Sequence, residues 1–169
     1  MAGVGNADVK VLGTSNLHNW SMEDRDVTCS VQFMYEVGKA MPVSLTTFTF
    51  AFPVRGLKSG KTEMDSKAYD AMKAQPLANI VFVASSSKII RGVDDQFTIK
   101  SSGHLTIAGV TKAVALTAAC SLKAFGTITC AGTDTLLMSD YQIESPTYLS
   151  GTLRTGNKLT IDFNMIVQR

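Results

Sequence analysis

The stretch TFTFAFPV, residues 47–54, decides the fold class of this chain of 169 residues. Phe48, Phe50 and Phe52 alternate with small or polar residues along it. A period of two in a run rich in aromatic residues is typical of a β-strand with one apolar face. The stretch therefore predicts a strand that carries three phenylalanine rings on the same face.

The same alternation recurs on both sides of this strand. Two further long strands are predicted at residues 30–37, which carry Phe33 and Tyr35, and at residues 159–167, which carry Phe163 and Met165. Shorter strands are predicted at residues 9–13, 80–84, 97–100, 105–108, 114–121, 127–131 and 153–154. Many short strands between turn residues favour an all-β sandwich or barrel, and closure into a barrel would remove the exposed strand edges.

Polar runs between the apolar segments are interpreted as turns or loops. The turns are expected at Gly38, at residues 92–95, at Ser101-Ser102-Gly103 and at residues 156–157. The serines at positions 85–87 are interpreted as a strand end or loop, and the acidic run Glu23-Asp24-Arg25-Asp26 as a solvated turn.

One segment, residues 62–74, departs from the period of two and predicts a short helix, placed around residues 66–74. Asp65 is the expected N-cap. Ala68, Tyr69 and Met72 fall at helical spacing, and Pro76 follows just beyond the last turn. The length fits one domain of roughly 100–200 residues, so residues 1–169 are expected to form one all-β domain with one inserted helix.

Composition excludes several classes of protein. Charged residues make up 18% of the chain, against about 25% in an average protein, which excludes a disordered chain or a coiled coil. Sixteen basic and fourteen acidic residues give a net charge of +2, too balanced for nucleic-acid binding. No apolar run approaches the roughly 18 residues of a membrane helix, so stable membrane insertion is not expected. Residues 1–7 do not read as a signal peptide.

The three cysteines leave two interpretations open. If residues 114–121 and 127–131 form a hairpin that turns near Phe125-Gly126, Cys120 and Cys130 face each other on neighbouring strands and could form a disulfide. In the alternative, Cys29, Cys120 and Cys130 are buried free thiols that pack as small apolar side chains.

Catalytic and metal-binding motifs are weak in this sequence. A zinc site needs three or four ligands, and His18 and His104 have no cysteine, histidine or carboxylate at ligand spacing. No metal site is therefore predicted. Among titratable residues near one strand, only His18, Tyr35 and Glu36 could serve an enzyme, and Glu36 alternates to the face opposite Tyr35. The chain is interpreted as a non-enzyme.

Four stretches, in order, resemble the YceI-like family. They are GTSNLHNW (residues 13–20), FPVRGLKSG (residues 52–60) leading into the helix, PLANIVF (residues 76–82) and GHLTIAGVTK (residues 103–112). The last is the most specific, because a glycine-led strand runs into a Gly-Val-Thr-Lys turn. Residues 151–153 and 159–163 fit the same pattern, so the resemblance spans nearly the whole chain.

This resemblance implies a lipocalin-like, extended antiparallel β-barrel with a central apolar tunnel. It implies a periplasmic or secreted protein that binds a lipophilic small molecule and needs no cofactor or catalytic residue. The bound molecule would be a polyisoprenoid, a quinone or a fatty acid. The family type also allows a homodimer. It places a histidine near position 18 as a structural or tunnel-mouth residue, and by period two His18 and Trp20 are expected to share a strand face.

The apolar residues at alternating positions are the candidates for the tunnel wall, since a linear isoprenoid is held mainly by burial of apolar surface. The candidates are Phe33, Tyr35, Phe48, Phe50, Phe52, Phe82, Phe163 and Met165. Period two shows which of them share a face, but it leaves open whether that face lines a tunnel or fills a core. A structural or interaction barrel with a filled core is therefore the alternative.

Three basic residues precede the predicted helix, namely Arg55, Lys58 and Lys61. They are candidates for binding a phosphate head group at the tunnel mouth, because cations form strong hydrogen bonds with phosphate. A solvated loop is the other interpretation of the same residues.

Overall fold

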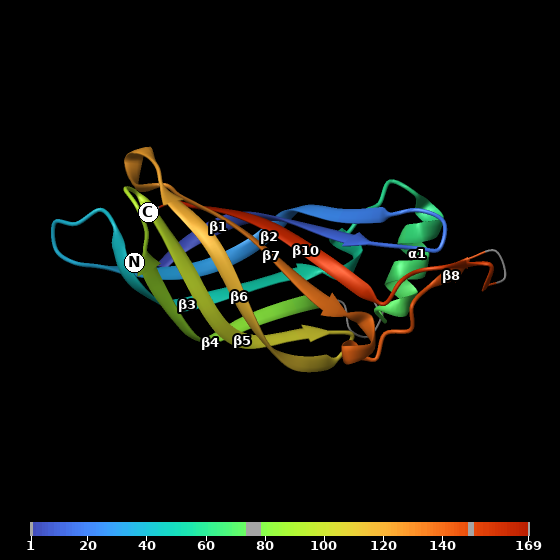
Figure 1. The fold of residues 1–169 in the computed structure, drawn as a ribbon. Coiled ribbons are helices and arrows are strands. Elements are labelled where there is room, and N and C mark those ends of the chain that lie inside the picture. The colour runs from blue at the N-terminus through green and yellow to red at the C-terminus, as the bar shows by residue number, and fades with distance from the viewer. Residues whose placement is uncertain (1, 74–78, 149–150, 169) are drawn as a thin grey trace.

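Eight long strands close into an antiparallel barrel in the computed structural model, which describes residues 2–73, 79–148 and 151–168 (Figure 1). The strands are β1 (Ala2–Gly13), β2 (Trp20–Tyr35), β3 (Pro42–Pro53), β4 (Asn79–Arg91), β5 (Gln96–Ile107), β6 (Val110–Leu122), β7 (Ile128–Leu137) and β10 (Lys158–Val167). Their order around the barrel is β1-β10-β7-β6-β5-β4-β3-β2, with β2 returning to β1. The expected all-β, lipocalin-like barrel is confirmed.

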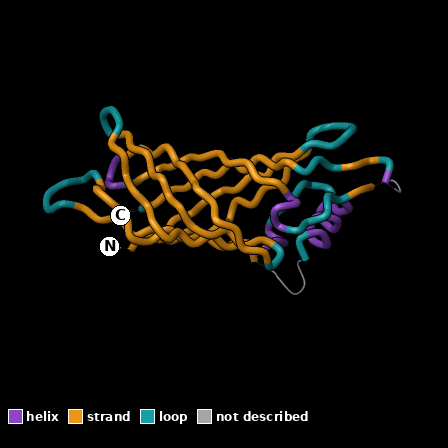
Figure 2. Tube along the Cα trace, turned by 60° about the horizontal axis from the view of Figure 1, so that its bottom comes forward, coloured by secondary structure: helices purple, strands orange, loops and turns teal. Residues whose placement is uncertain are grey.

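The connections gather at the two ends of the barrel (Figure 2). At one end, which we call the helix end, lie the helix α1 (Thr62–Ala71), the short helices η1 (Val54–Gly56) and η3 (Met138–Tyr141), and the two-stranded sheet of β8 (Thr147–Tyr148) and β9 (Leu153–Arg154). At the other end, which we call the terminus end, lie both chain termini and η2 (Ala124–Gly126). No helix among the described residues is long and apolar enough to cross a bilayer.

Of the two interpretations of the cysteines, the structure supports the disulfide. Cys120 on β6 and Cys130 on β7 are register partners, their Cα atoms lie 4.1 Å apart and their sulfur atoms are bonded. Cys29, on β2, is a buried free thiol.

Two runs of small residues that were expected to be turns or loops lie inside strands. Ser101-Ser102-Gly103 belongs to β5, and the serines at 85–87 belong to β4. Ser101 is 2% exposed, and its hydroxyl shares a hydrogen bond of 2.7 Å with that of Ser87. A Cβ on Gly103 would collide with the backbone of Val83. The small side chains therefore allow close packing of two paired strands, which the sequence reading mistook for a turn.

The acidic run at residues 23–26 also lies inside a strand, so the expected solvated turn is wrong. The run forms a bulge in the middle of β2, where the register against β1 shifts between Ala7 and Val9. Asp24 is buried and accepts a hydrogen bond of 2.9 Å from the backbone N–H of Asp26. The bulge tolerates the charged residues because it turns the next ones, Arg25 and Asp26, to solvent.

The inserted helix is confirmed, with different boundaries. It begins at Thr62 after an N-cap at Lys61, so Asp65 is not the cap. Asp65 instead lies in the first turn and accepts hydrogen bonds from the backbone N–H and the hydroxyl of Ser59, at 2.8 and 2.6 Å. The helix ends at Ala71, and the expected end at Ala74, with residues 76–78, lies outside the described residues.

Candidate functional site

The interior of the barrel is divided into a filled half and a hollow half. At the terminus end, Phe33 packs edge-to-face against both Tyr35 and Phe97, with ring centroids 6.4 Å apart in each pair. Ile99 and Ile128 are 1% exposed beside them. We call this the filled half, because its described side chains pack against one another.

The helix end of the barrel holds a cavity of about 140 Å³, which is about ten times the roughly 10–15 Å³ that one water needs. Inward-facing side chains of all eight long strands and of α1 line it. We call this space the helix-end cavity, and almost all of its wall is apolar.

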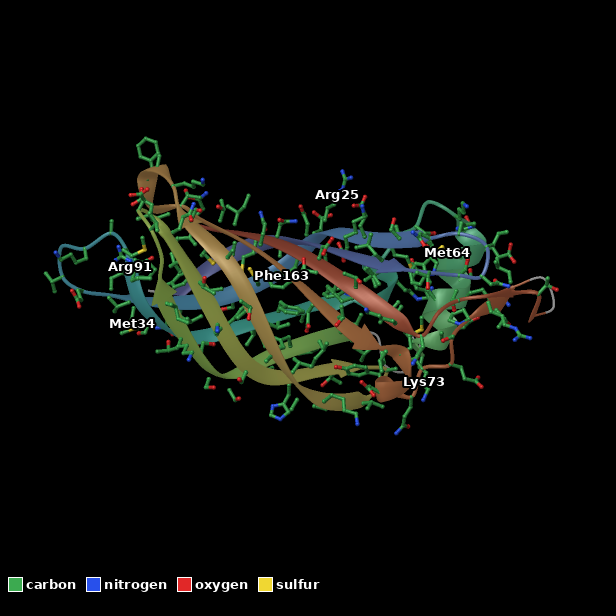
Figure 3. All side chains as sticks on the ribbon, viewed as in Figure 1. Arg25, Met34, Met64, Lys73, Arg91 and Phe163 are labelled. Atoms are coloured by element: carbon green, nitrogen blue, oxygen red, sulfur yellow. A yellow bond between two sulfur atoms is a disulfide. The ribbon has the colours of Figure 1, made fainter. Side chains whose placement is uncertain are left out.

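Five of the expected wall residues line the helix-end cavity, namely Phe48, Phe50, Phe52, Phe163 and Met165. Phe163 projects from the middle of β10 (Figure 3). Phe50 is only half-buried by protein, in contrast to Phe48 and Phe52. Because it lines the cavity, the ring of Phe50 has free space on one side.

The other three expected wall residues do not line the cavity. Phe33 and Tyr35 belong to the filled half. Phe82 is completely buried and stacks on Phe50, with centroids 5.3 Å apart and an angle of 22° between the rings. It therefore supports the wall from the neighbouring strand.

The helix α1 closes the cavity at its outer end. Met64, Ala68, Ala71 and Met72 line the cavity from the helix, and Met64 is labelled there in Figure 3. The buried Tyr69 fixes the helix in place, because its hydroxyl donates a hydrogen bond of 2.6 Å to the carbonyl of Leu57. Helical spacing grouped Ala68, Tyr69 and Met72, but sequence reasoning assigned no helix residue a place in the site.

The three basic residues before α1 lie outside the cavity wall. The guanidinium of Arg55 and the ammonium of Lys58 lie 5.2 and 5.6 Å from the ring centroid of Tyr69, on which they make cation–π contacts. Lys61 is the N-cap residue of α1. The structure therefore gives Arg55 and Lys58 a packing role on the helix, and none of the three residues contacts the cavity.

Trp20 and His18 are separated by the start of β2. Trp20 begins the strand, lines the cavity and donates a hydrogen bond of 3.0 Å from its indole N–H to the carbonyl of Thr14. His18 is exposed in the preceding loop, with its Nδ1 2.8 Å from the carbonyl oxygen of Asn19. The expected shared strand face is wrong, because the strand begins after His18.

Titratable side chains are rare on the cavity wall. Asp134, on β7, and Cys29 are the two that line the helix-end cavity among the described residues. Burial raises the pKa of the Cys29 thiol above its ordinary value. Sequence reasoning missed Asp134, although the period of two on β7 aligns it with Leu136, an apolar wall residue.

A second polar group is buried close to this wall. The hydroxyl of Tyr141, on η3, has no hydrogen-bond partner among the described residues. Burial, and then the charges of Asp140 and Asp134, raise the pKa of Tyr141 to about 12.

The three titratable residues considered for catalysis do not come together in the structure. His18 lies at the helix end, whereas Tyr35 and Glu36 lie at the terminus end of β2. General acid–base catalysis needs such groups within hydrogen-bond reach of one substrate, so these three do not form a catalytic site. Within the described part of the chain, no three metal-ligating side chains cluster either.

The sequence and the fold were compared with those of known proteins. A family model described as a YceI-like domain matches residues 10–167. The sequence matches no curated protein.

Solved structures share the fold at low sequence identity. The structure of BcnA from Burkholderia cenocepacia has a TM-score of 0.74 and 15% identity, with 95% of each chain covered. A polyisoprenoid binding domain from Saccharophagus degradans has a TM-score of 0.72 and 10% identity, over 98% of this chain and 97% of that one. The YceI protein of Campylobacter jejuni has a TM-score of 0.63 and 16% identity, over 86% and 83%.

Proposed function

Because this chain belongs to the YceI-like domain family, we propose that it binds and carries a lipophilic amphiphile whose tail lies in the helix-end cavity. The amphiphile is a polyisoprenoid, a quinone or a fatty acid. The observation that carries this proposal is the cavity itself, an apolar space in one half of a barrel whose other half is packed.

The cavity wall fits a flexible hydrocarbon chain. A hydrocarbon tail makes no hydrogen bonds, so its binding free energy comes from burial of apolar surface at roughly 25 cal/mol per Å². Five of the eight methionines line the cavity, namely Met22, Met64, Met72, Met138 and Met165. Methionine side chains are flexible and adapt to irregular shapes, which suits a tail with several conformations.

Two further observations support parts of the proposal. The Saccharophagus degradans domain, which shares the fold, is described as polyisoprenoid binding. The Cys120–Cys130 disulfide supports a periplasmic or secreted location, because disulfides persist in oxidising compartments. The proposed role is non-enzymatic, and it is supported by the described residues of the cavity wall, among which Asp134 and Cys29 are the titratable side chains. A homodimer stays a prediction.

Native mass spectrometry with matched variants tests this function. The chain is incubated with prenols of 10, 15, 20 and 40 carbons, as roughly sized probes of cavity length, and separately with a prenylated quinone and a fatty acid. We expect stoichiometric complexes with at least one prenol. Ala68→Trp places an indole in the cavity and should abolish them, whereas Ser66→Trp, on the exposed face of the same helix, should not.

The outcome that contradicts the proposal is equally clear. If no prenol, quinone or fatty acid binds, or if Ala68→Trp binds as well as Ser66→Trp, the helix-end cavity is not the site. A failure of all three ligand classes would favour the structural or interaction barrel.

A further inference from the structure

We propose that Asp134 selects the head group of the ligand, and that the head group is a hydrogen-bond donor rather than an anion. Alcohol, amide and ammonium groups share this chemistry. The inference rests on the proposed function, since it concerns the polar end of an amphiphile whose tail lies in the helix-end cavity.

Asp134 has an unusual environment for a carboxylate. It is half-buried on β7 and lines the cavity, and its register partner on β10 is Ile161, another cavity residue. Its Oδ1 accepts a hydrogen bond of 2.8 Å from the backbone N–H of Thr135. Within the described residues it forms no ion pair, since Arg25–Glu23 is the one salt bridge found there. The carboxylate therefore has acceptor capacity left for a ligand.

The other polar side chains on this wall have their donors engaged. The indole N–H of Trp20 donates a hydrogen bond to the carbonyl oxygen of Thr14. The hydroxyl of Thr155 donates a hydrogen bond of 2.8 Å to the carbonyl oxygen of Pro146. A ligand head group in the cavity therefore meets a negatively charged acceptor and few free donors. An acceptor of this kind attracts O–H and N–H groups and repels carboxylate and phosphate.

Asp134 also lies beyond the part of β7 that pairs with β6. The ladder between β6 and β7 has four register pairs, from Leu122–Ile128 to Ala119–Ala131. Beyond them the two strands diverge toward the helix end (Figure 1). Asp134 lies three residues beyond Ala131, the last residue of β7 in this ladder, so it has a described register partner on β10 but none on β6.

The buried hydroxyl of Tyr141 lies in the segment that follows β7. Its neighbours in the chain, Met138 and Ile143, both line the cavity. A buried hydroxyl without a partner costs about 1–3 kcal/mol. Tyr141 itself is not a wall residue of the cavity, so Asp134 alone carries the head-group proposal.

The basic residues before α1 would favour an anionic head group, which is the opposite of the preference expected from Asp134. Arg55 and Lys58 contact Tyr69 and do not line the cavity. A phosphate head group bound to them would therefore lie away from Asp134. If those residues chose the ligand, anions would bind best.

A head-group series of constant tail length tests the proposal. The probes are dodecan-1-ol, dodecanamide, dodecylamine and dodecanoate, with dodecane as the tail without a head group, each used below its micelle concentration. The single tryptophan, Trp20, lines the cavity and reports binding through its fluorescence. The variants are Asp134→Asn and, as the matched control on the adjacent strand, Asp162→Asn. Asp162 accepts a hydrogen bond from Thr133 on the outer face.

We expect dodecylamine and dodecanol to bind at least tenfold more tightly than dodecanoate, as a hydrogen bond to a charged group is worth a factor of roughly ten or more. Asp134→Asn should reduce the preference for dodecylamine over dodecanoate at least tenfold, and Asp162→Asn should leave it unchanged. If all probes bind and their order is the same in Asp134→Asn, the head-group proposal is wrong and the proposed function stands. If no probe binds, including dodecane, the proposed function itself fails.

Discussion

The division of the barrel into a filled and a hollow half predicts different effects on stability and on ligand affinity for two phenylalanine-to-alanine substitutions. Phe97→Ala removes a ring from the filled half, and Phe50→Ala removes one from the wall of the helix-end cavity. We expect Phe97→Ala to lower stability strongly and to leave ligand affinity intact. Phe50→Ala should lower stability less and weaken ligand binding.

The expected magnitudes follow from the surroundings of each ring. Phe97 is 2% exposed and packs against Phe33, so its truncation should cost about 3–5 kcal/mol of unfolding free energy. Phe50 stacks on Phe82 and Phe52, but it has free space on its cavity side. Because fewer contacts are lost there, the cost should be about 1–2 kcal/mol.

The affinity change is estimated from the area that the ring covers on the ligand. A ring that buries about 55 Å² of a ligand tail contributes about 1.4 kcal/mol at 25 cal/mol per Å², which is a tenfold change in affinity. Phe50→Ala should therefore weaken binding of a 20-carbon prenol by about tenfold. Phe97→Ala should change it by less than about twofold, since no cavity wall is altered.

The assay is guanidinium unfolding of each variant, followed by titration of the same prenol with Trp20 fluorescence. The result that refutes the reasoning is a loss of affinity in Phe97→Ala that equals or exceeds the loss in Phe50→Ala. Equal destabilisation of the two variants would show that the helix-end cavity is as tightly packed as the filled half.

Three other predictions concern the framework around the site. Reduction of the Cys120–Cys130 disulfide, which closes a loop of ten residues, should cost about 2–3 kcal/mol, measured as a lower melting temperature with prenol affinity unchanged. Tyr141→Phe should raise the free energy of unfolding by about 1 kcal/mol, because it removes a buried hydroxyl without a described partner. The pKa of Tyr141 rises from 10.0 to about 12 on folding, so ionisation of this side chain favours the unfolded state between pH 10 and 12. The free energy of unfolding should therefore fall across that range, and it should fall less in Tyr141→Phe. Gly103→Ala should destabilise the barrel by about 1–3 kcal/mol, because its Cβ would collide with the backbone of Val83, and an unchanged unfolding midpoint would contradict this packing.

Much of the fold was predictable, because period two is imposed directly by the alternation of side chains along a strand. The phenylalanines of β3 and the apolar positions of β10 show it without interruption. The residue numbers of a hairpin around Phe125 made Cys120 and Cys130 partners but left a disulfide and free thiols open, and the structure has the disulfide.

The errors arose where local composition and tertiary packing disagree. Serine and glycine at 101–103 are favoured in turns, yet here their small size permits two strands to pack closely. The charged residues at 23–26 are tolerated inside β2 because a bulge turns Arg25 and Asp26 to solvent. Neither effect is visible in a single stretch of sequence, since both depend on the neighbouring strand.

The hollow half could not be predicted because period two says which residues share a face and not what lies opposite them. Phe33 and Phe50 have the same pattern in the sequence, but only Phe50 lines the cavity. The difference depends on Phe97, which fills the space beside Phe33 from a distant strand.

The methionine methyl groups offer the most direct test that a ligand tail occupies the helix-end cavity. Met22, Met64, Met72, Met138 and Met165 line it, whereas Met34 is exposed and Met41 is buried elsewhere. In a methyl NMR titration of the chain labelled with ¹³C at methionine methyl groups, a 20-carbon prenol should shift the resonances of the five cavity methionines and leave those of Met34 and Met41 in place. Shifts confined to Met34 and Met41, or no shifts at saturating prenol, would contradict the account.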